Sequence, residues 1–175
     1  IRAEEHNEKV REAAIDFAFT IGRYPDAVEH IEYLIDKRGI EKTADLQVKL
    51  AEATFQTGDY PKAATILEEL IGFDPARESF DTDFARAPSE AKAYFDLAQL
   101  YRDQLFENEQ ADNVIEQMVA VNPDSFKAYQ LRANYRTRYS DEESDTALAD
   151  RDIQKAVELA PDDEEVLLAA ADIAI

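Results

Sequence analysis

The side chains that could do chemistry in this chain are mostly carboxylates, and their spacing forms no recognisable catalytic site. The sequence has 39 Asp and Glu residues, 19 Lys and Arg residues, two His and no Cys. The lack of cysteine excludes disulfides, thiolate nucleophiles and thiolate metal sites. His6 and His30 show no His-x-x-x-His spacing, and His30 is expected to be a solvated surface residue. No Gly-x-Ser-x-Gly elbow and no glycine-rich phosphate loop occurs in the sequence.

Three acidic runs, at 81–83, 141–143 and 162–165, are the next candidates. A calcium loop starting at the first run would need glycine where Arg86 stands and glutamate where Lys92 stands. The other two runs are expected at helix N-termini, where the helix dipole favours negative charge. In so acidic a chain, pairs of carboxylates arise by coincidence. We therefore predict no enzyme activity, no metal site and no cofactor.

The formal net charge of −20 excludes general nucleic-acid binding, because such a field repels polyphosphates. An acidic surface fits basic partners, a saline environment or solubility alone, and solubility is the first interpretation. No apolar run approaches the roughly 18–20 residues of a membrane span, and no signal-peptide pattern is present. The sequence starts with Ile1 rather than methionine, so a removed signal or a longer parent protein is an open alternative. The compartment, cytoplasmic or exported, and the oligomeric state are not predicted.

A hexapeptide Gly-x-Tyr-Pro-x-Ala occurs at 22–27 and again at 58–63, 36 residues further along the chain. A turn glycine, an aromatic residue and a helix-starting proline that recur at this interval indicate one structural unit used more than once. Such a period is typical of a solenoid with a binding surface rather than a reaction centre.

A second pattern extends the repeat over the whole chain. Four alanines are each followed by an aliphatic residue at i+4, and an apolar residue follows at i+7, which predicts a helix buried on one face. The four stripes are Ala27, Ile31, Leu34; Ala63, Leu67, Leu70; Ala111, Ile115, Met118; and Ala149, Ile153, Ala156. Another helix precedes each of them, most clearly at Tyr94-x-x-Leu97-Ala98-x-x-Tyr101.

On these residues the chain resembles the tetratricopeptide repeat family, whose units combine Trp-x-x-Leu-Gly-x-x-Tyr with Ala-x-x-x-Phe and Pro. The resemblance implies an all-α fold, a right-handed superhelical solenoid of antiparallel helix pairs. We expect units at about 4–40, 43–75, 89–123 and 124–161, a half unit at 162–175, and a connector at 76–88 that splits the array or bridges it. The expected helices are 4–21, 25–38, 43–57, 61–73, 89–105, 109–121, 124–139, 145–159 and 163–175.

Two further features concern the packing of the fourth unit and the start of the last helix. Arg132 and Arg136 occupy positions where the family has large apolar residues, so the packing there is an open question. Asp162 and Glu165 are expected to form an acidic capping box at the start of the last helix.

In tetratricopeptide proteins the first helix of each pair lines the concave face, so the resemblance implies partner contacts there. In the later units these candidate positions are Lys92, Phe95, Gln99, Arg102, Lys127, Gln130, Asn134 and Arg138. In the early units they are Lys9, Glu12, Asp16, Phe19, Lys49, Glu52, Phe55 and Gln56. The cations could instead pair with neighbouring acids, and Phe19 and Phe55 are expected in the core. A clamp for chaperone C-termini is not expected. Members of the family that bind such termini use lysine and asparagine early in the groove, and Asp16 and Glu52 stand at the asparagine-like and neighbouring positions of this chain.

The main functional hypothesis is a non-enzymatic scaffold that binds a protein or peptide in the concave face. The alternative is a regulatory or assembly segment of a larger enzyme or secretion protein, which serves docking or oligomerisation. A helical-repeat RNA binder is disfavoured by the negative charge.

Overall fold

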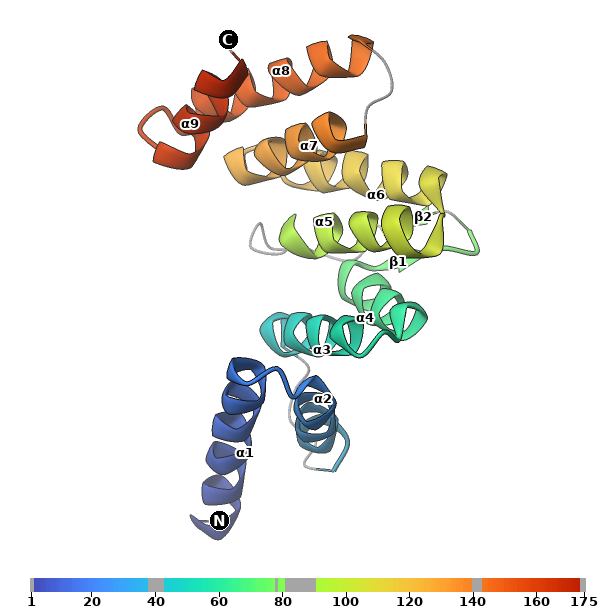
Figure 1. Cartoon of the computed structure of the whole chain (residues 1–175), viewed down its shortest axis with the longest axis vertical. Helices are drawn as coiled ribbons and strands as arrows, with labels where there is room; N and C mark the ends of the chain where they lie inside the picture. Colours follow the sequence, from blue (N-terminus) through green and yellow to red (C-terminus); the bar gives the residue numbers. More distant parts are fainter. Residues whose placement is uncertain (1, 38–42, 78, 81–90, 140–142, 174–175) are drawn as a thin grey trace. The chain divides into compact units, whose positions relative to one another are not determined.

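The structure is a computed structural model that describes residues 2–37, 43–77, 79–80, 91–139 and 143–173 (Figure 1). The chain divides into two compact units, Ile1–Gly72 and Phe73–Ile175. Within the described ranges, helices appear at all nine places where the sequence predicts them. Their bounds are α1 Arg2–Thr20, α2 Tyr24–Glu32 with a π-helical turn η1 Tyr33–Lys37, α3 Ala44–Gln56, α4 Tyr60–Ile71, α5 Ala91–Leu100 with a π-helical turn η3 Tyr101–Leu105, α6 Asn108–Val121, α7 Phe126–Tyr139, α8 Glu143–Leu159 and α9 Glu164–Ile173.

The first unit consists of α1 to α4, with each helix packed on the next one along the chain. The predicted stripe of Ala27, Ile31 and Leu34 is buried, and Ile31 and Leu34 form a cluster with Ile15 and Leu50. Alanine in the stripe lets neighbouring helices approach closely, while the branched side chains fill the remaining space. The predicted all-α fold of antiparallel helix pairs is therefore confirmed in this unit.

The repeated hexapeptide forms the turn between the two helices of each pair in this unit. Gly22 has a φ of 70° and Gly58 has a φ of 85°. Both values lie in the left-handed region, which L side chains rarely adopt. The tyrosine that follows each glycine packs against a phenylalanine five residues before it. The ring centroids of Phe19 and Tyr24 are 5.7 Å apart, and those of Phe55 and Tyr60 are 5.2 Å apart.

The two phenylalanines of these ring pairs, Phe19 and Phe55, pack inside the first unit. Phe19 packs against buried residues of the core, as predicted. Phe55 is half-buried against Tyr60. The repeating motif is thus longer than the hexapeptide and starts at the phenylalanine.

The second unit contains α5 to α9 and a short strand pair. The strands β1 (Phe73–Asp74) and β2 (Ser79–Phe80) pair antiparallel, with Phe73 opposite Phe80. The Phe73 ring also lies 6.2 Å from the Tyr101 ring. Two-residue strands leave no periodic signal, so the sequence predicts only a connector at 76–88. Residues 78 and 81–88 of that connector lie outside the described part of the chain.

The stripes of the second unit are buried as predicted. Ala111, Ile115 and Met118 on α6 are each at most 1% exposed, and the stripe on α8 is buried as well. One prediction at α9 is wrong, because the helix is capped by Asp163 and not by Asp162. The Asp163 Oδ1 atom accepts hydrogen bonds from the backbone N–H groups of Glu165 and Val166, at 3.0 and 3.1 Å. The helix begins one residue later than the capping box implied.

Candidate functional site

The candidate site lies in the second unit, where α5 and α7 pack against each other (Figure 1). We call the eight predicted contact residues on these two helices and η3 the first-helix row. On the α5 side the row is Lys92, Phe95, Gln99 and Arg102, and on the α7 side it is Lys127, Gln130, Asn134 and Arg138. Side-chain contacts join the two sides, since Arg138 Nη2 lies 3.0 Å from Asp103 Oδ2 on η3.

Each of the four cations in the row has a carboxylate partner in the same unit. Lys92 pairs with Asp96 one turn further along α5, and Arg102 lies 3.4 Å from Asp112 on α6. Lys127 Nζ donates to Glu165 Oε2 on α9 at 2.6 Å. The row therefore presents ion pairs and amides, with exposed lysines at one end.

The uncharged members of the row differ in burial. Asn134 is exposed, and Phe95 and Gln99 are half-buried. Gln130 is buried, and its side-chain oxygen has no hydrogen-bond partner among the described residues. A buried amide oxygen without a donor costs about 1–3 kcal/mol, and neighbouring side chains cover this one from solvent.

Beside the row, the largely buried Arg132 and Arg136 form an ion cluster with the buried Asp152 of α8 and the exposed Glu116 of α6. Asp152 is only 5% exposed and accepts from both guanidinium groups. Glu116 bonds Arg132 Nη1 and Arg136 Nη2, each at 2.6 Å. Burial lowers the pKa of Arg132, but the hydrogen bonds and charges of Asp152 and Glu116 outweigh it and raise that pKa above its usual value.

This cluster explains why two arginines stand where the family has apolar residues. Their charges are paired and their stems pack between helices, which answers the question left open by the sequence. Asp152 is not among the residues predicted from the sequence, although the sequence contains a signal for it. Asp152 falls inside the buried stripe of α8, between Ala149 and Ala156, where an unpaired carboxylate is not tolerated.

Two tyrosines near the end of α7 complete the polar network. Tyr135 donates to Asp112 Oδ1 at 2.6 Å, and Tyr139 donates to Asp103 Oδ2 at 2.8 Å. The Arg102 guanidinium lies 5.9 Å from the Tyr135 ring centroid and 5.4 Å from the Tyr139 ring centroid. Burial raises the pKa of both phenols above their usual value, and the adjacent carboxylates raise it further.

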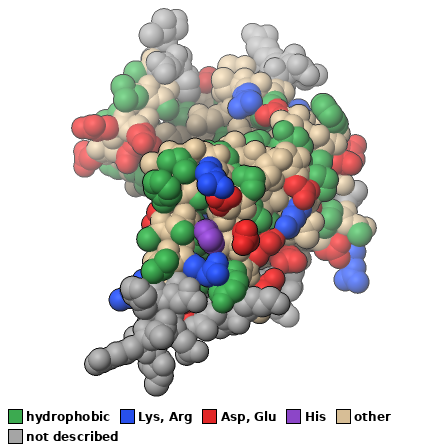
Figure 2. Space-filling model, turned by 60° about the horizontal axis from the view of Figure 1, so that its bottom comes forward, with side chains coloured by type: hydrophobic (Ala, Val, Ile, Leu, Met, Phe, Trp, Pro, Cys, Tyr) green, Lys and Arg blue, Asp and Glu red, His purple; other side chains and the backbone are tan. Residues whose placement is uncertain are grey.

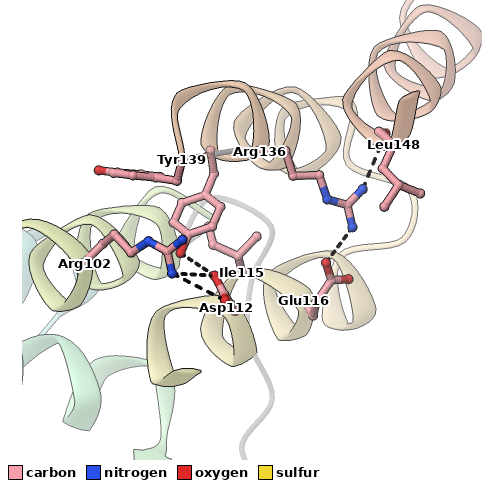
Figure 3. Close-up of a pocket in the computed structure, with 8 residues that line it drawn as sticks. Arg102, Asp112, Ile115, Glu116, Arg136, Tyr139 and Leu148 are labelled. Carbon is pink, nitrogen blue, oxygen red and sulfur yellow. Dashed lines mark hydrogen bonds and ion pairs between the residues drawn. The ribbon is translucent and has the colours of Figure 1, made fainter. Parts of the chain in front are cut away.

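A hollow of about 250 Å³ opens beside this network, between η3, α6, α7 and α8 (Figure 3). Its lining residues are Arg102, Asp112, Ile115, Glu116, Tyr135, Arg136, Tyr139 and Leu148. Among them, only Arg102 is a contact residue predicted from the sequence. The hollow combines residues from four segments, and the spacing of residues within one helix does not reveal such a combination.

The first unit carries the other eight predicted contact residues. Lys49 of α3 and Asp16 of α1 form an exposed ion pair with a Nζ–Oδ1 distance of 2.9 Å. His30 is half-buried and lies 3.0 Å from Arg11 Nη1 through its Nδ1 atom, so the expectation of a solvated histidine is wrong. Figure 2 shows one face of the protein, on which acidic and basic side chains lie next to each other.

The described residues contain no group of three or more His, Asp or Glu side chains placed to hold a metal ion. Within the same ranges, no helix has the length and apolar character of a membrane span.

Comparison with known proteins agrees with the helix-pair architecture. Family models described as tetratricopeptide repeat match residues 13–78 and 91–125, together more than half of the chain. No curated protein matches the sequence significantly.

Solved structures give the same fold. A crystal structure of MamA is similar with a TM-score of 0.57 and 19% identity, covering 91% of this chain and 82% of that one. MamA 41-end from Desulfovibrio magneticus RS-1 is similar with a TM-score of 0.56 and 17% identity, covering 95% of this chain and 82% of that one. At this identity the likeness shows the fold alone. With its two matched segments and its stacked helix pairs, the chain belongs to the tetratricopeptide repeat family.

Proposed function

We propose that the chain is a non-enzymatic scaffold that binds a protein or peptide along the first-helix row. Repeats of this family form protein-interaction scaffolds, and the row provides amide and ammonium groups suited to an extended peptide. The observation that carries the proposal is the exposed ammonium groups of Lys92 and Lys127 in the row, because carboxylates of a partner can reach them from solvent. Phe95, half-buried in the same row, supplies apolar contact area.

The lysines of the row suit carboxylates of a partner. The ammonium groups of Lys92 and Lys127 are exposed and keep donors beyond the one used in each ion pair. Exposed ion pairs contribute little to stability, so exchanging one for a contact with a partner costs little. The row can therefore bind a peptide without loss of the fold.

The test begins with a random peptide library displayed on phage and panned against the immobilised chain. The dissociation constant of an enriched, fluorescently labelled peptide is then measured by polarisation for the wild type, Lys127→Glu and a control, Lys155→Glu on α8. We expect a loss of about tenfold or more for the first variant, which corresponds to about 1.4 kcal/mol. The control should stay within about twofold. Equal affinity for all three proteins would remove the row from the proposal.

A second candidate function, docking or oligomerisation within a larger assembly, has its own supporting observation on α1. Val10 and Phe17 on α1 and Ile21 directly after it form an exposed apolar stripe, with Phe17 63% exposed. Thirty-six residues after the first two, at the repeat-equivalent positions, Leu46 and Ala53 lie on α3, which packs against α2. Because α2 packs against α3, where the equivalent residues lie, the exposed stripe on α1 suits packing by another amphipathic helix. Light scattering on the wild type and Phe17→Glu tests self-association through this face.

A further inference from the structure

The hollow beside the row has a charge arrangement that points to one class of occupant. Its two lining carboxylates, Asp112 and Glu116, keep 58% and 55% of their side-chain surface exposed. Its two lining guanidinium groups, Arg102 and Arg136, are only 20% and 17% exposed. A group that enters from solvent therefore meets carboxylate oxygens first.

The hydrogen bonds of the carboxylates leave room for another donor. Each carboxylate offers about four lone-pair sites. Glu116 uses one site on each oxygen, for Arg132 and for Arg136. Asp112 Oδ1 accepts from Tyr135, and its contacts with Arg102 are long, at 3.4 and 3.5 Å. Arg136, by contrast, already donates to Asp152 and Glu116.

The walls of the hollow suit an apolar stem that carries a charge at its end. Ile115 and Tyr135 are buried in the wall, and the apolar side chain of Leu148 is exposed at the rim (Figure 3). Small-molecule pockets usually enclose about 300–1,000 Å³. A hollow of about 250 Å³ is closer to the size of one side chain. Lysine and arginine place a hydrocarbon stem on apolar surface and keep the cation at a polar rim.

We propose that this hollow, which we call the α6–α8 pocket, binds an arginine or lysine side chain of the partner protein. The cation contacts Asp112 and Glu116, and its stem lies along Leu148 and Tyr139. This inference rests on the proposed function, because it names the chemistry of a protein partner. The net charge of −20 favours the same class, since it attracts basic segments over long range.

The direct test uses single amino-acid probes, so it does not depend on finding the partner. N-acetyl-arginine amide is titrated into the ¹⁵N-labelled chain, and backbone amide shifts are followed by NMR. N-acetyl-citrulline amide has nearly the same shape without the charge, and N-acetyl-glutamate amide carries the opposite charge. We expect the arginine probe to bind weakly, with a roughly millimolar dissociation constant, and to shift amides near 112–116, 135–139 and 148. The citrulline probe should bind at least about fivefold more weakly, because it loses the charge-assisted hydrogen bonds.

Two variants locate the charge that the arginine probe contacts. Asp112→Asn removes the charge and keeps an acceptor for the Tyr135 hydroxyl, so arginine binding should fall at least about threefold. Glu109→Gln on the same helix removes an exposed charge outside the pocket and should leave binding within about twofold. Circular dichroism verifies that both variants fold.

Three results would overturn the pocket. These are equal binding of citrulline and arginine, preference for glutamate, and arginine shifts spread over acidic surface with none concentrated in the pocket. If the probes fail while panned peptides still bind the row, the pocket is wrong and the scaffold function stands. If the probes bind and no peptide is enriched, the scaffold function loses support instead.

Discussion

Arg132 holds Asp152 with two parallel hydrogen bonds, Nε to Oδ2 at 2.9 Å and Nη2 to Oδ1 at 2.6 Å. This fork-to-fork contact joins α7 to α8 in the interior of the second unit, and Arg136 adds a third bond at 2.7 Å. Bidentate arginine–carboxylate pairs fix orientation as well as adding energy. The pair therefore sets the register of the two helices beside the candidate site.

Removing Asp152 should strongly destabilise the second unit. Asp152→Ala leaves two guanidinium groups largely buried without their main partner, which costs about 3–5 kcal/mol. Glu158→Ala, on the exposed side of α8, breaks only an ion pair with Lys155. This control should cost about 0.5 kcal/mol or less. Urea unfolding followed by circular dichroism compares the two.

Removing the arginines together with Asp152 should rescue the stability lost in Asp152→Ala. Replacing the cluster by apolar side chains, as Arg132→Met, Arg136→Met and Asp152→Leu together, should restore most of the lost stability, because no buried charge remains. If Asp152→Ala unfolds at the urea concentration of the wild type, the carboxylate does not hold the arginines in the way described.

Gly58 should be sensitive to substitution through its backbone conformation alone. A Cβ added there meets no atom within 4 Å, so Gly58→Ala causes no clash. Its φ of 85° is nevertheless left-handed. An L residue held in that region costs about 1–2 kcal/mol. Asparagine tolerates the region better, so Gly58→Asn should cost less than Gly58→Ala in the same unfolding experiment. Equal stability of all three proteins would show that the turn relaxes.

The Asp96 carboxyl gives a pH-dependent prediction. Burial raises its pKa, and the hydrogen bond and charge of Lys92 offset this only in part. A carboxyl with a raised folded-state pKa contributes stability below its unfolded pKa of 3.8, and that contribution is lost as pH rises through the folded value. At pH 7, Asp96→Asn should therefore be as stable as the wild type or more stable, by about 1 kcal/mol or less, because it relieves the partial burial of a charge and loses only a weak, solvent-screened pair with Lys92.

The pH profile of that variant provides the control. The gain of Asp96→Asn over the wild type should shrink as pH falls through the raised folded-state pKa, where the wild-type carboxyl takes up its proton. Thermal melts of both proteins at a series of pH values measure the difference. A variant that is less stable than the wild type at pH 7 and equal to it at pH 4 would mean that the ion pair outweighs burial.

A new charge should change the free energy of unfolding very differently at two repeat-equivalent positions. Phe17 is exposed on α1. Phe17→Asp should therefore change the free energy of unfolding by about 0.5 kcal/mol or less. Ala53, at the equivalent position on α3, is fully buried, and Ala53→Asp should cost several kcal/mol. Thermal unfolding distinguishes the two directly. A large loss from Phe17→Asp would show that the exposed stripe packs within the chain.

The sequence predicted the helices well because each carries its own signal. Alanine stripes with a helical period, turn glycines and helix-starting prolines are local patterns that span only a few residues. Each helix can therefore be predicted from its own segment of the sequence. The ion cluster depends on Glu116 meeting Arg132 and Arg136 across two helices, and the sequence does not encode that distance locally. The strand pair at Phe73 and Phe80 is too short to show a period. The α6–α8 pocket could not be predicted from the sequence either, since it forms only where four segments meet.

Lys127 and Glu165 allow the most direct measurement of the central claim, because their charges can be exchanged. Lys127→Glu alone breaks the 2.6 Å pair between α7 and α9, whereas Lys127→Glu with Glu165→Lys restores a pair of reversed polarity. If the row binds a peptide through the Lys127 ammonium group, both proteins should bind the selected peptide about tenfold or more weakly than the wild type. Wild-type affinity in the exchanged protein, or in both, would contradict the claim, because the lysine would then serve only to join the two helices.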